Sequence, residues 1–207
     1  MKPRTTILLA DDHEIVRMGL ASLIGTKKDL EVVGEAEDGE AAVRKAIRLK
    51  PDVVVMDLMM PRKDGASATA EIRQHIPATK VLVLTSYGTA DGIAHALAAG
   101  ANGALMKSTE FSVLVSAIRT IAAGGHVVAP EIERQLVEDP PVPELTSRQL
   151  EVLHSIMRGL TNAEIAMQLG IREDSVKEHV NAIFEKLCAS NRSEAVTIAM
   201  RKHIVTA

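Results

Sequence analysis

Short apolar runs alternate with longer amphipathic stretches through the first part of the chain, and this alternation limits the fold more than any other feature. The runs are rich in β-branched residues and lack a polar face, which is typical of parallel strands buried on both sides. Stretches of roughly 10–15 residues with helical periodicity separate them, which indicates helices on both faces of one parallel sheet. Five strands are predicted, near residues 7–10, 31–34, 53–56, 81–84 and 104–106.

A proline-rich stretch, Pro140-Pro141-Val142-Pro143, divides the chain. Three prolines in four positions cannot continue a helix or join the centre of a sheet, so the stretch predicts a linker. Downstream, the sequence has helical periodicity and no strand pattern. Four helices are predicted, near residues 146–158, 161–168, 172–187 and 191–203. We therefore expect an α/β domain over 1–125, a linker over 126–141 and a small all-α domain over 142–207.

Composition excludes several classes of protein. The single cysteine, Cys188, rules out a disulfide framework and a cysteine-rich zinc site. Three aromatic residues in 207 are too few for a stacking platform for single-stranded nucleic acid. No window approaches the roughly 18 apolar residues that span a bilayer, and the N-terminal apolar run is too short for a signal peptide. We expect a cytoplasmic protein with no membrane partner.

Polar side chains follow four of the five predicted strands. Asp11 and Asp12 come after the first strand, Asp57 after the third, Thr85 after the fourth and Lys107 after the fifth. Because the carboxyl ends of parallel strands meet at one edge of a sheet, these side chains should converge. Three carboxylates in a small cleft repel each other, so a hard cation is expected, and oxygen ligands favour Mg²⁺.

The same cluster has the chemistry for phosphoryl transfer. Asp57 can attack a phosphoryl group and form an aspartyl phosphate. Lys107 can neutralise phosphoryl oxygens, and the Thr85 hydroxyl can donate one hydrogen bond to them. Taken singly, each residue has a plainer explanation: a helix cap for the aspartates, a turn for the threonine, a solvated charge for the lysine. Their joint order at successive strand ends favours the phosphoryl chemistry.

Residues 5–122 resemble the receiver domain of response regulators, which has a flavodoxin-like doubly wound fold. The matching motifs are Asp11-Asp12, the run from Asp57 to Gly65, Thr85-Ser86 and Lys107. The resemblance implies that Asp57 is the phosphoacceptor and that Thr85 and Lys107 contact the phosphoryl group. It also implies that Mg²⁺ is held by Asp11 or Asp12, by Asp57 and by the backbone carbonyl of Met59.

One position departs from the receiver pattern. Receivers usually carry a tyrosine or phenylalanine three residues before the lysine, and this aromatic side chain takes part in the conformational switch. Here that position is Ala104. Tyr87 is a candidate substitute, two residues after Thr85. Ala104 therefore supports an alternative function, in which the receiver is a dimerisation scaffold that works without phosphorylation.

The C-terminal region contains signals for a helix-turn-helix. Thr146 with Gln149, and Thr161 with Glu164, have the spacing of capping boxes that begin helices. Leu169-Gly170-Ile171 joins two of the predicted helices. Residues 145–196 resemble the LuxR-type helix-turn-helix of the NarL/FixJ family of response regulators. The resemblance rests on runs that include Gly159–Asn162, Glu164–Ala166, Leu169–Ile171, Ser175–Lys177 and Asn191–Ala195.

That family places the third helix of this domain in the major groove of DNA. Lys177, Glu178 and Asn181 are then the candidate base readers, since they share one helix face. Candidate phosphate contacts are Thr161, Asn162, Arg172, Ser175, His179 and Arg192, each of which has capping, packing or solvation as the alternative role. Residues 142–207 hold equal numbers of basic and acidic side chains, so binding as a homodimer to two half-sites is expected.

Together these features predict a transcriptional response regulator rather than an enzyme. A sensor histidine kinase is the expected phosphoryl donor, double-stranded promoter DNA is the expected target, and slow autodephosphorylation is the only catalysis expected. A phosphoaspartyl phosphatase is the enzymatic alternative for the acidic cluster. The C-terminal region offers no nucleophile–base set to support it.

Overall fold

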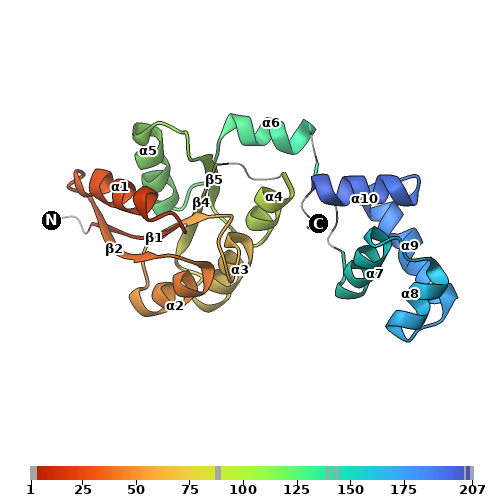
Figure 1. Cartoon of the computed structure of the whole chain (residues 1–207). Coiled ribbons are helices and arrows are strands. Elements are labelled where there is room, and N and C mark those ends of the chain that lie inside the picture. The colour runs from red at the N-terminus through yellow and green to blue at the C-terminus, as the bar shows by residue number, and fades with distance from the viewer. Residues whose placement is uncertain are drawn as a thin grey trace. The chain divides into compact units, whose positions relative to one another are not determined.

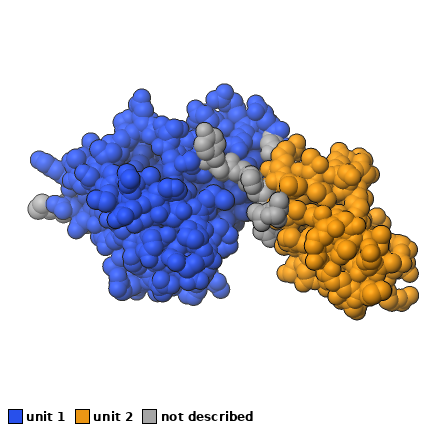
Figure 2. All heavy atoms as spheres, viewed as in Figure 1, with its two compact units in different colours: residues 1–140 blue, residues 141–207 orange. Residues whose placement is uncertain are grey.

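The computed structural model divides the chain into two compact units, residues 1–140 and 141–207 (Figures 1 and 2). It describes residues 4–86, 90–138, 140, 141, 143, 145–202, 204 and 205. None of the helices in these ranges has the length and apolar character needed to cross a membrane. The hydrophobic cores do not cross between the units: two lie in the first unit and one in the second.

A parallel sheet forms the centre of the first unit, as predicted. Its described strands are β1 (Thr5–Ala10), β2 (Leu30–Ala36), β3 (Val53–Asp57), β4 (Lys80–Thr85), β5 (Gly103–Met106) and β6 (Val127–Val128). Their order in the sheet is β2-β1-β3-β4-β5-β6. The chain winds outward in one direction from β1 to β2 and in the other from β3 onward. This doubly wound order creates a crevice at the carboxyl ends of β1 and β3.

In the described part of the first unit, six helices accompany the sheet: α1 (Glu14–Gly25), α2 (Gly39–Leu49), α3 (Gly65–His75), α4 (Ala90–Ala98), α5 (Phe111–Ala122) and α6 (Pro130–Glu138). Alternate residues of the central strands enter two cores. Val53 and Val55 pack with residues of α1 and α5, whereas Val54 and Met56 pack with residues of α2 and α3. Burial on both faces explains why these strands are apolar throughout.

The number of strands predicted from the sequence was wrong, because β6 adds a sixth strand. Val127 and Val128 pair with Gly103 and Ala104 of β5. Gly103 permits this approach, since a Cβ atom there would lie 2.2 Å from the Val127 carbonyl oxygen. The interval 126–141, expected to be a linker, therefore holds β6 and α6, which pack on the first unit. A strand of two residues has no detectable period, so the sequence pattern did not reveal it.

Ile132 anchors α6 on the first core and is fully buried there. We expect Ile132→Ala to lower the free energy of unfolding of the first unit by roughly 2–5 kcal/mol. Val137→Ala is the matched control, because Val137 lies on the same helix with 81% of its surface exposed. Urea unfolding followed by the fluorescence of Tyr87 reports on the first unit, since the chain has one tyrosine and no tryptophan. Equal, small effects of both variants would contradict the packed position of α6.

The described part of the second unit is helical, as predicted. It contains α7 (Ser147–Met157), α8 (Asn162–Leu169), α9 (Glu173–Leu187) and α10 (Arg192–Arg201). Both predicted capping boxes form: Thr146 caps α7 with Gln149, and Thr161 caps α8 with Glu164. Gly170 ends α8 in the left-handed conformation, with φ of 63°. One apolar face of α9 enters the core, through Val176, Val180, Ile183 and Leu187.

Candidate functional site

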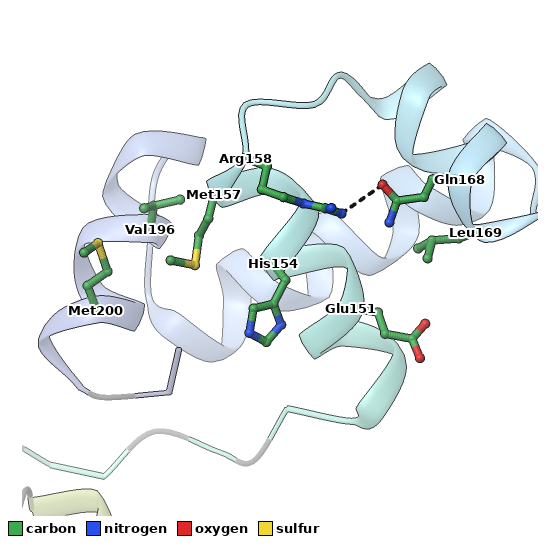
Figure 3. Close-up of a pocket in the computed structure, with 8 residues that line it drawn as sticks. All are labelled: Glu151, His154, Met157, Arg158, Gln168, Leu169, Val196 and Met200. Atoms are coloured by element: carbon green, nitrogen blue, oxygen red, sulfur yellow. Dashed lines mark hydrogen bonds between the residues drawn. The ribbon is translucent and has the colours of Figure 1, made fainter. Parts of the chain in front are cut away.

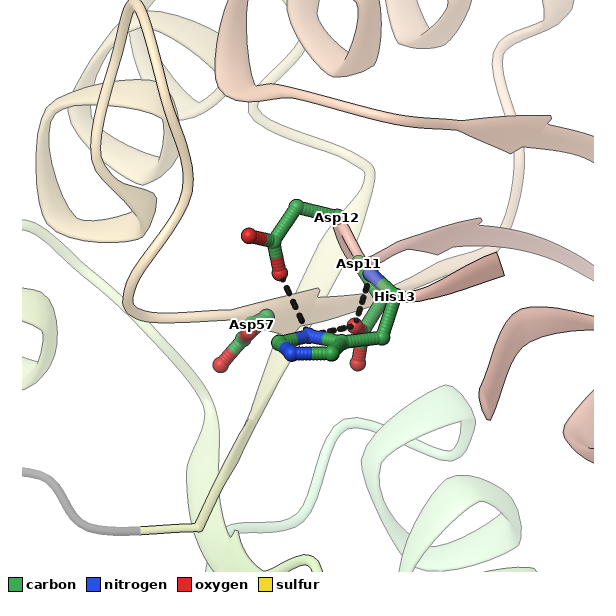
Figure 4. A group of neighbouring side chains, drawn as sticks. All are labelled: Asp11, Asp12, His13 and Asp57. Carbon is green, nitrogen blue, oxygen red and sulfur yellow. Dashed lines mark hydrogen bonds and ion pairs between the residues drawn. The ribbon is translucent and has the colours of Figure 1, made fainter. Parts of the chain in front are cut away.

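Three carboxylates meet at the carboxyl ends of β1 and β3. Asp11 follows β1 directly, Asp12 is the next residue, and Asp57 is the last residue of β3. One ligand atom from each of Asp11, Asp12, His13 and Asp57 lies within 4.8 Å of the others (Figure 4). Asp11 and Asp57 are buried, whereas Asp12 and His13 are exposed. The structure thus brings together the aspartates that the sequence pattern placed at one edge of the sheet.

Lys107 lies between the two buried carboxylates. Its Nζ atom is 2.6 Å from Oδ2 of Asp11 and 2.8 Å from Oδ2 of Asp57. Its backbone N–H donates to the Thr85 carbonyl at 2.7 Å, which joins the ends of β4 and β5. Thr85 itself is buried as the last residue of β4. The Lys107 ammonium group and the Thr85 residue therefore lie at the same sheet edge as the carboxylates.

The electrostatics of this cluster reflect burial. Burial raises the pKa of Asp57 above its ordinary value, and the hydrogen bond from Lys107 offsets this only in part. Burial lowers the pKa of Lys107, but hydrogen bonds to Asp11 and Asp57 outweigh this effect, so its pKa is raised. Asp57 is thus a comparatively basic carboxylate held beside a firmly charged ammonium group. Such a carboxylate is suited to attack an electrophile whose developing negative charge the lysine can neutralise.

A divalent cation fits this donor set. Three carboxylates face one lysine, so negative charge is in excess, and the oxygen donors are those that hard cations prefer. Met59 follows in the β3–α3 loop, and hydrogen bonding from its backbone favours the charged form of Asp57. The Met59 side chain is exposed, so only its backbone is a candidate ligand at this site.

Two residues near the carboxylates were not singled out from the sequence. His13 places Nδ1 2.7 Å from Oδ1 of Asp12, and the backbone N–H of His13 donates to Oδ1 of Asp11 at 2.9 Å. Arg17, one turn into α1, donates from Nη1 to the Asp11 carbonyl oxygen at 2.6 Å. The signal for His13 was its position beside the acidic pair. Arg17 follows from helical spacing only once α1 is known to begin at Glu14.

Ala104 is fully buried within the sheet. It pairs with Val83 of β4 on one side and with Val128 of β6 on the other. Its carbonyl oxygen also accepts a hydrogen bond from Ala129 at 3.0 Å. A small residue thus occupies the position where receivers usually have an aromatic side chain. Tyr87, the candidate substitute, lies outside the described residues.

In the second unit, the three candidate base readers lie exposed on α9. Lys177, Glu178 and Asn181 share one face of the helix. The Nζ atom of Lys177 is 3.2 Å from Oδ1 of Asp174 and 3.6 Å from Oε1 of Glu173. The hydrogen bond to Asp174 is the main cause of a raised pKa for Lys177. These carboxylates therefore hold the lysine in its charged form.

Several candidate phosphate contacts have structural partners. Thr161 caps α8. Arg192 donates from Nη1 to Oδ1 of Asn162 at 3.3 Å and from Nη2 to the Leu160 carbonyl oxygen, which ties the start of α10 to the start of α8. Burial lowers the pKa of Arg192. The other three lie on or beside α9: Arg172 is exposed, and Ser175 and His179 are half-buried.

A groove of about 730 Å³ lies elsewhere in the second unit, bounded by α7, α8 and α10 (Figure 3). Its lining is mainly apolar and includes Met157, Val196 and Met200. Arg158 closes one part of it by donating to Gln168 at 2.8 Å. None of the candidate DNA contacts lines the groove. The sequence pattern gave no sign of it, because its residues come from three separate helices.

Known protein families match both units. The model described as "Response regulator receiver domain" matches residues 7–119. The model described as "Bacterial regulatory proteins, luxR family" matches residues 143–199. The first match contains all the acidic residues of the cluster, Thr85 and Lys107, and the second contains all four described helices of the second unit up to Ala199.

Several known proteins match this chain over almost its whole length. Transcriptional regulatory protein LnrK of Bacillus subtilis is 39% identical, and the match covers 94% of this chain and 96% of LnrK. Response regulator protein VraR of Staphylococcus aureus is 37% identical over 96% of this chain and 98% of VraR. The crystal structure of response regulator ChrA, from a haem-sensing two-component system, is 35% identical with a TM-score of 0.58, over 98% of this chain and 99% of ChrA. The chain therefore belongs to the two-component response regulators that join a receiver domain to a LuxR-type DNA-binding domain.

Proposed function

We propose that Asp57 receives a phosphoryl group from a phosphohistidine of a sensor histidine kinase, with a divalent cation, Mg²⁺, at the acidic cluster. The observation that carries this proposal is the position of the Lys107 Nζ atom, within 2.8 Å of both buried carboxylates at the sheet edge. An ammonium group shared by Asp11 and Asp57 is well placed to move onto a phosphoryl oxygen when the Asp57 oxygen becomes covalently bound. The protein acts here as phosphoryl acceptor, in the cytoplasm where the kinase and the DNA meet.

The transfer is a displacement at phosphorus. An Asp57 carboxylate oxygen attacks, the bond from phosphorus to the imidazole nitrogen of the donor breaks, and that nitrogen leaves with the electron pair. Lys107 neutralises charge on the equatorial oxygens, and the Thr85 hydroxyl donates a hydrogen bond to one of them. Asp11, Asp12, Asp57 and the Met59 carbonyl would hold Mg²⁺, which supplies further neutralisation of the phosphoryl oxygens.

We further propose that phosphorylation raises the affinity of the chain for promoter DNA, which it binds as a homodimer. Lys177, Glu178 and Asn181 would read bases, with Arg172, Ser175 and His179 near the backbone. Thr161, Asn162 and Arg192 would support this surface through their bonds at the start of α8 as well as through phosphate contacts. The equal numbers of acidic and basic side chains after residue 141 favour two half-sites over one.

Incubation of the full chain with acetyl phosphate tests the phosphoacceptor role. We expect intact-mass spectrometry to show one added phosphoryl group per chain when Mg²⁺ is present and none when EDTA removes it. Labelling that is equally efficient in EDTA would contradict the cation's role. Repeated release of phosphate from a phosphomonoester would instead support the phosphatase alternative.

The buried position of Ala104 favours a second candidate function, a dimeric transcription factor that does not depend on phosphorylation. Position 104 of β5, between β4 and β6, holds alanine and not the aromatic side chain that takes part in the usual receiver switch. This candidate predicts the same DNA affinity with and without a phosphodonor.

A further inference from the structure

The β3–α3 loop, residues 58–64, carries the Met59 carbonyl, and an ion pair between Lys63 and Glu71 ties its outer part to α3. The Gly65 N–H donates to the Leu58 carbonyl oxygen at 2.8 Å, which closes the loop. A side chain at Gly65 would not fit, because its Cβ atom would lie 2.1 Å from the Asp57 carbonyl oxygen. Leu58 and Met60 are buried in the first and second cores, on either side of Met59. Beyond Met60 the loop turns outward, and Pro61 and Arg62 are exposed.

The N-terminus of α2 holds this outer part of the loop. Asp38, with only 1% of its surface exposed, uses both carboxylate oxygens. Oδ1 accepts a hydrogen bond from the Ala41 N–H at 2.7 Å and so caps α2, while Oδ2 forms an ion pair with the Arg62 guanidinium. The backbones also touch, since a Cβ atom at Gly39 would lie 2.2 Å from the Lys63 carbonyl oxygen.

Arg62 has a backbone conformation that needs outside support. Its φ of 65° lies in the left-handed region, which is unfavourable for a residue with a long side chain. Such a conformation persists where the surroundings fix it. The buried Asp38 carboxylate in turn requires a cationic partner. Arg62 thus supplies the cation that the buried Asp38 carboxylate requires, and Asp38 supplies an anchor for Arg62.

We propose that Asp38 and Arg62 form a clamp that positions the Met59 carbonyl for divalent-cation binding. Both are positioning residues, since they act through the loop and supply no ligand atom. The inference rests on the proposed cation site. It adds one requirement to the acidic cluster and Lys107. The loop must be tied to α2 through Arg62 so that the Met59 carbonyl keeps its direction.

Two substitutions test the clamp without removing other features. Asp38→Ser keeps an N-cap for α2, because serine caps as well as aspartate does, but its side chain is too short to reach Arg62. Arg62→Asn removes the guanidinium and keeps a residue that tolerates positive φ. We expect each substitution to weaken Mg²⁺ binding to the full chain about ten-fold, measured by isothermal titration calorimetry. This is the lower end of the range of effects found when a residue that orients a metal ligand is lost.

The double variant distinguishes a pair from two independent effects. If the two residues act only through each other, the double variant Asp38→Ser with Arg62→Asn should bind Mg²⁺ as weakly as each single variant does. Its total loss should then be about ten-fold, and not the product of the two single losses. Arg44→Gln is the matched control. Arg44 also lies on α2 and pairs with an acidic residue, Glu40, but this pair is exposed and includes no residue of the loop. We expect Arg44→Gln to bind Mg²⁺ as the unsubstituted chain does.

A second measurement separates positioning from general damage to the fold. At saturating Mg²⁺, both clamp variants should reach the same extent of acetyl-phosphate labelling as the unsubstituted chain, so only the Mg²⁺ concentration for half-maximal labelling rises. Unchanged Mg²⁺ affinity in both variants would overturn the clamp and leave the proposed cation site intact. Labelling that stays low at saturating Mg²⁺ would also overturn it, because the defect would then lie in the fold. An unsubstituted chain that binds no Mg²⁺ would overturn the cation site and the clamp together.

Discussion

Asp57→Asn is expected to reduce phosphoryl labelling of the chain to background. Asparagine keeps the shape of the side chain, but its amide lacks the anionic oxygen that attacks phosphorus. The neighbouring carboxylates do not replace it. Asp11 has both oxygens engaged, Oδ1 by the backbone N–H of His13 and Oδ2 by Lys107, and Asp12 is partnered by His13. The loss should be complete rather than partial, because the two remaining carboxylates of the described cluster keep these contacts.

Labelling with acetyl phosphate and Mg²⁺, read by intact mass, measures this effect. Asp64→Asn is the matched control. Asp64 lies seven residues away and caps α3 by accepting a hydrogen bond from the Ser67 N–H at 2.7 Å. Asparagine caps equally well, so this variant makes the same change in charge without loss of the fold. Asp57→Asn with normal labelling, located by peptide mapping at another residue, would show that the phosphoacceptor is misassigned.

Lys177→Ala is expected to weaken binding to specific promoter DNA by roughly 10-fold or more, since a lysine contact to a guanine edge contributes about 1–3 kcal/mol. The surroundings of Lys177 add to the effect. Its ammonium group neutralises Glu173 and Asp174 at the start of α9, and Glu178 follows on the same exposed surface. Without the lysine, a cluster of unpaired carboxylates would face the DNA and repel the phosphates.

Fluorescence anisotropy with a labelled duplex, at several salt concentrations, measures this change. Lys28→Ala serves as control, because Lys28 is an exposed lysine of the first unit and its loss changes the net charge equally. An equal effect of both variants would mean that net charge, rather than placement on α9, determines affinity. If Lys177→Ala binds as well as the unsubstituted chain, α9 is not the DNA-reading helix.

The sheet was predictable from sequence because its strands have a regular local pattern, and the acidic edge was predictable because it follows from the sheet. The strands are apolar on both faces, and the structure shows why: successive residues such as Val54 and Val55 enter different cores. Once a parallel sheet is inferred, its carboxyl edge follows from topology alone. Asp11, Asp57 and Lys107 could therefore be brought together, although they are far apart in the chain.

What escaped prediction depends on contacts without a period. The strand β6 is two residues long, and its place beside β5 depends on the missing side chain at Gly103. The Asp38–Arg62 pair joins the end of β2 to a loop after β3, and a capping aspartate looks the same in sequence whether or not its second oxygen is used. Arg192 was predicted as a phosphate contact, but its hydrogen bonds to Asn162 and Leu160 were not visible in the sequence.

Selection of genomic DNA fragments by the purified full chain tests the central claim, that phosphorylation of Asp57 controls DNA binding. The chain is mixed with fragments at near-physiological salt, with or without Mg²⁺ and acetyl phosphate, and the retained DNA is sequenced. We expect a shared inverted repeat to be enriched only when both are present, and not by Asp57→Asn under any condition. Equal enrichment of the same repeat with and without the phosphodonor would contradict the account and leave a DNA-binding protein that does not need phosphorylation.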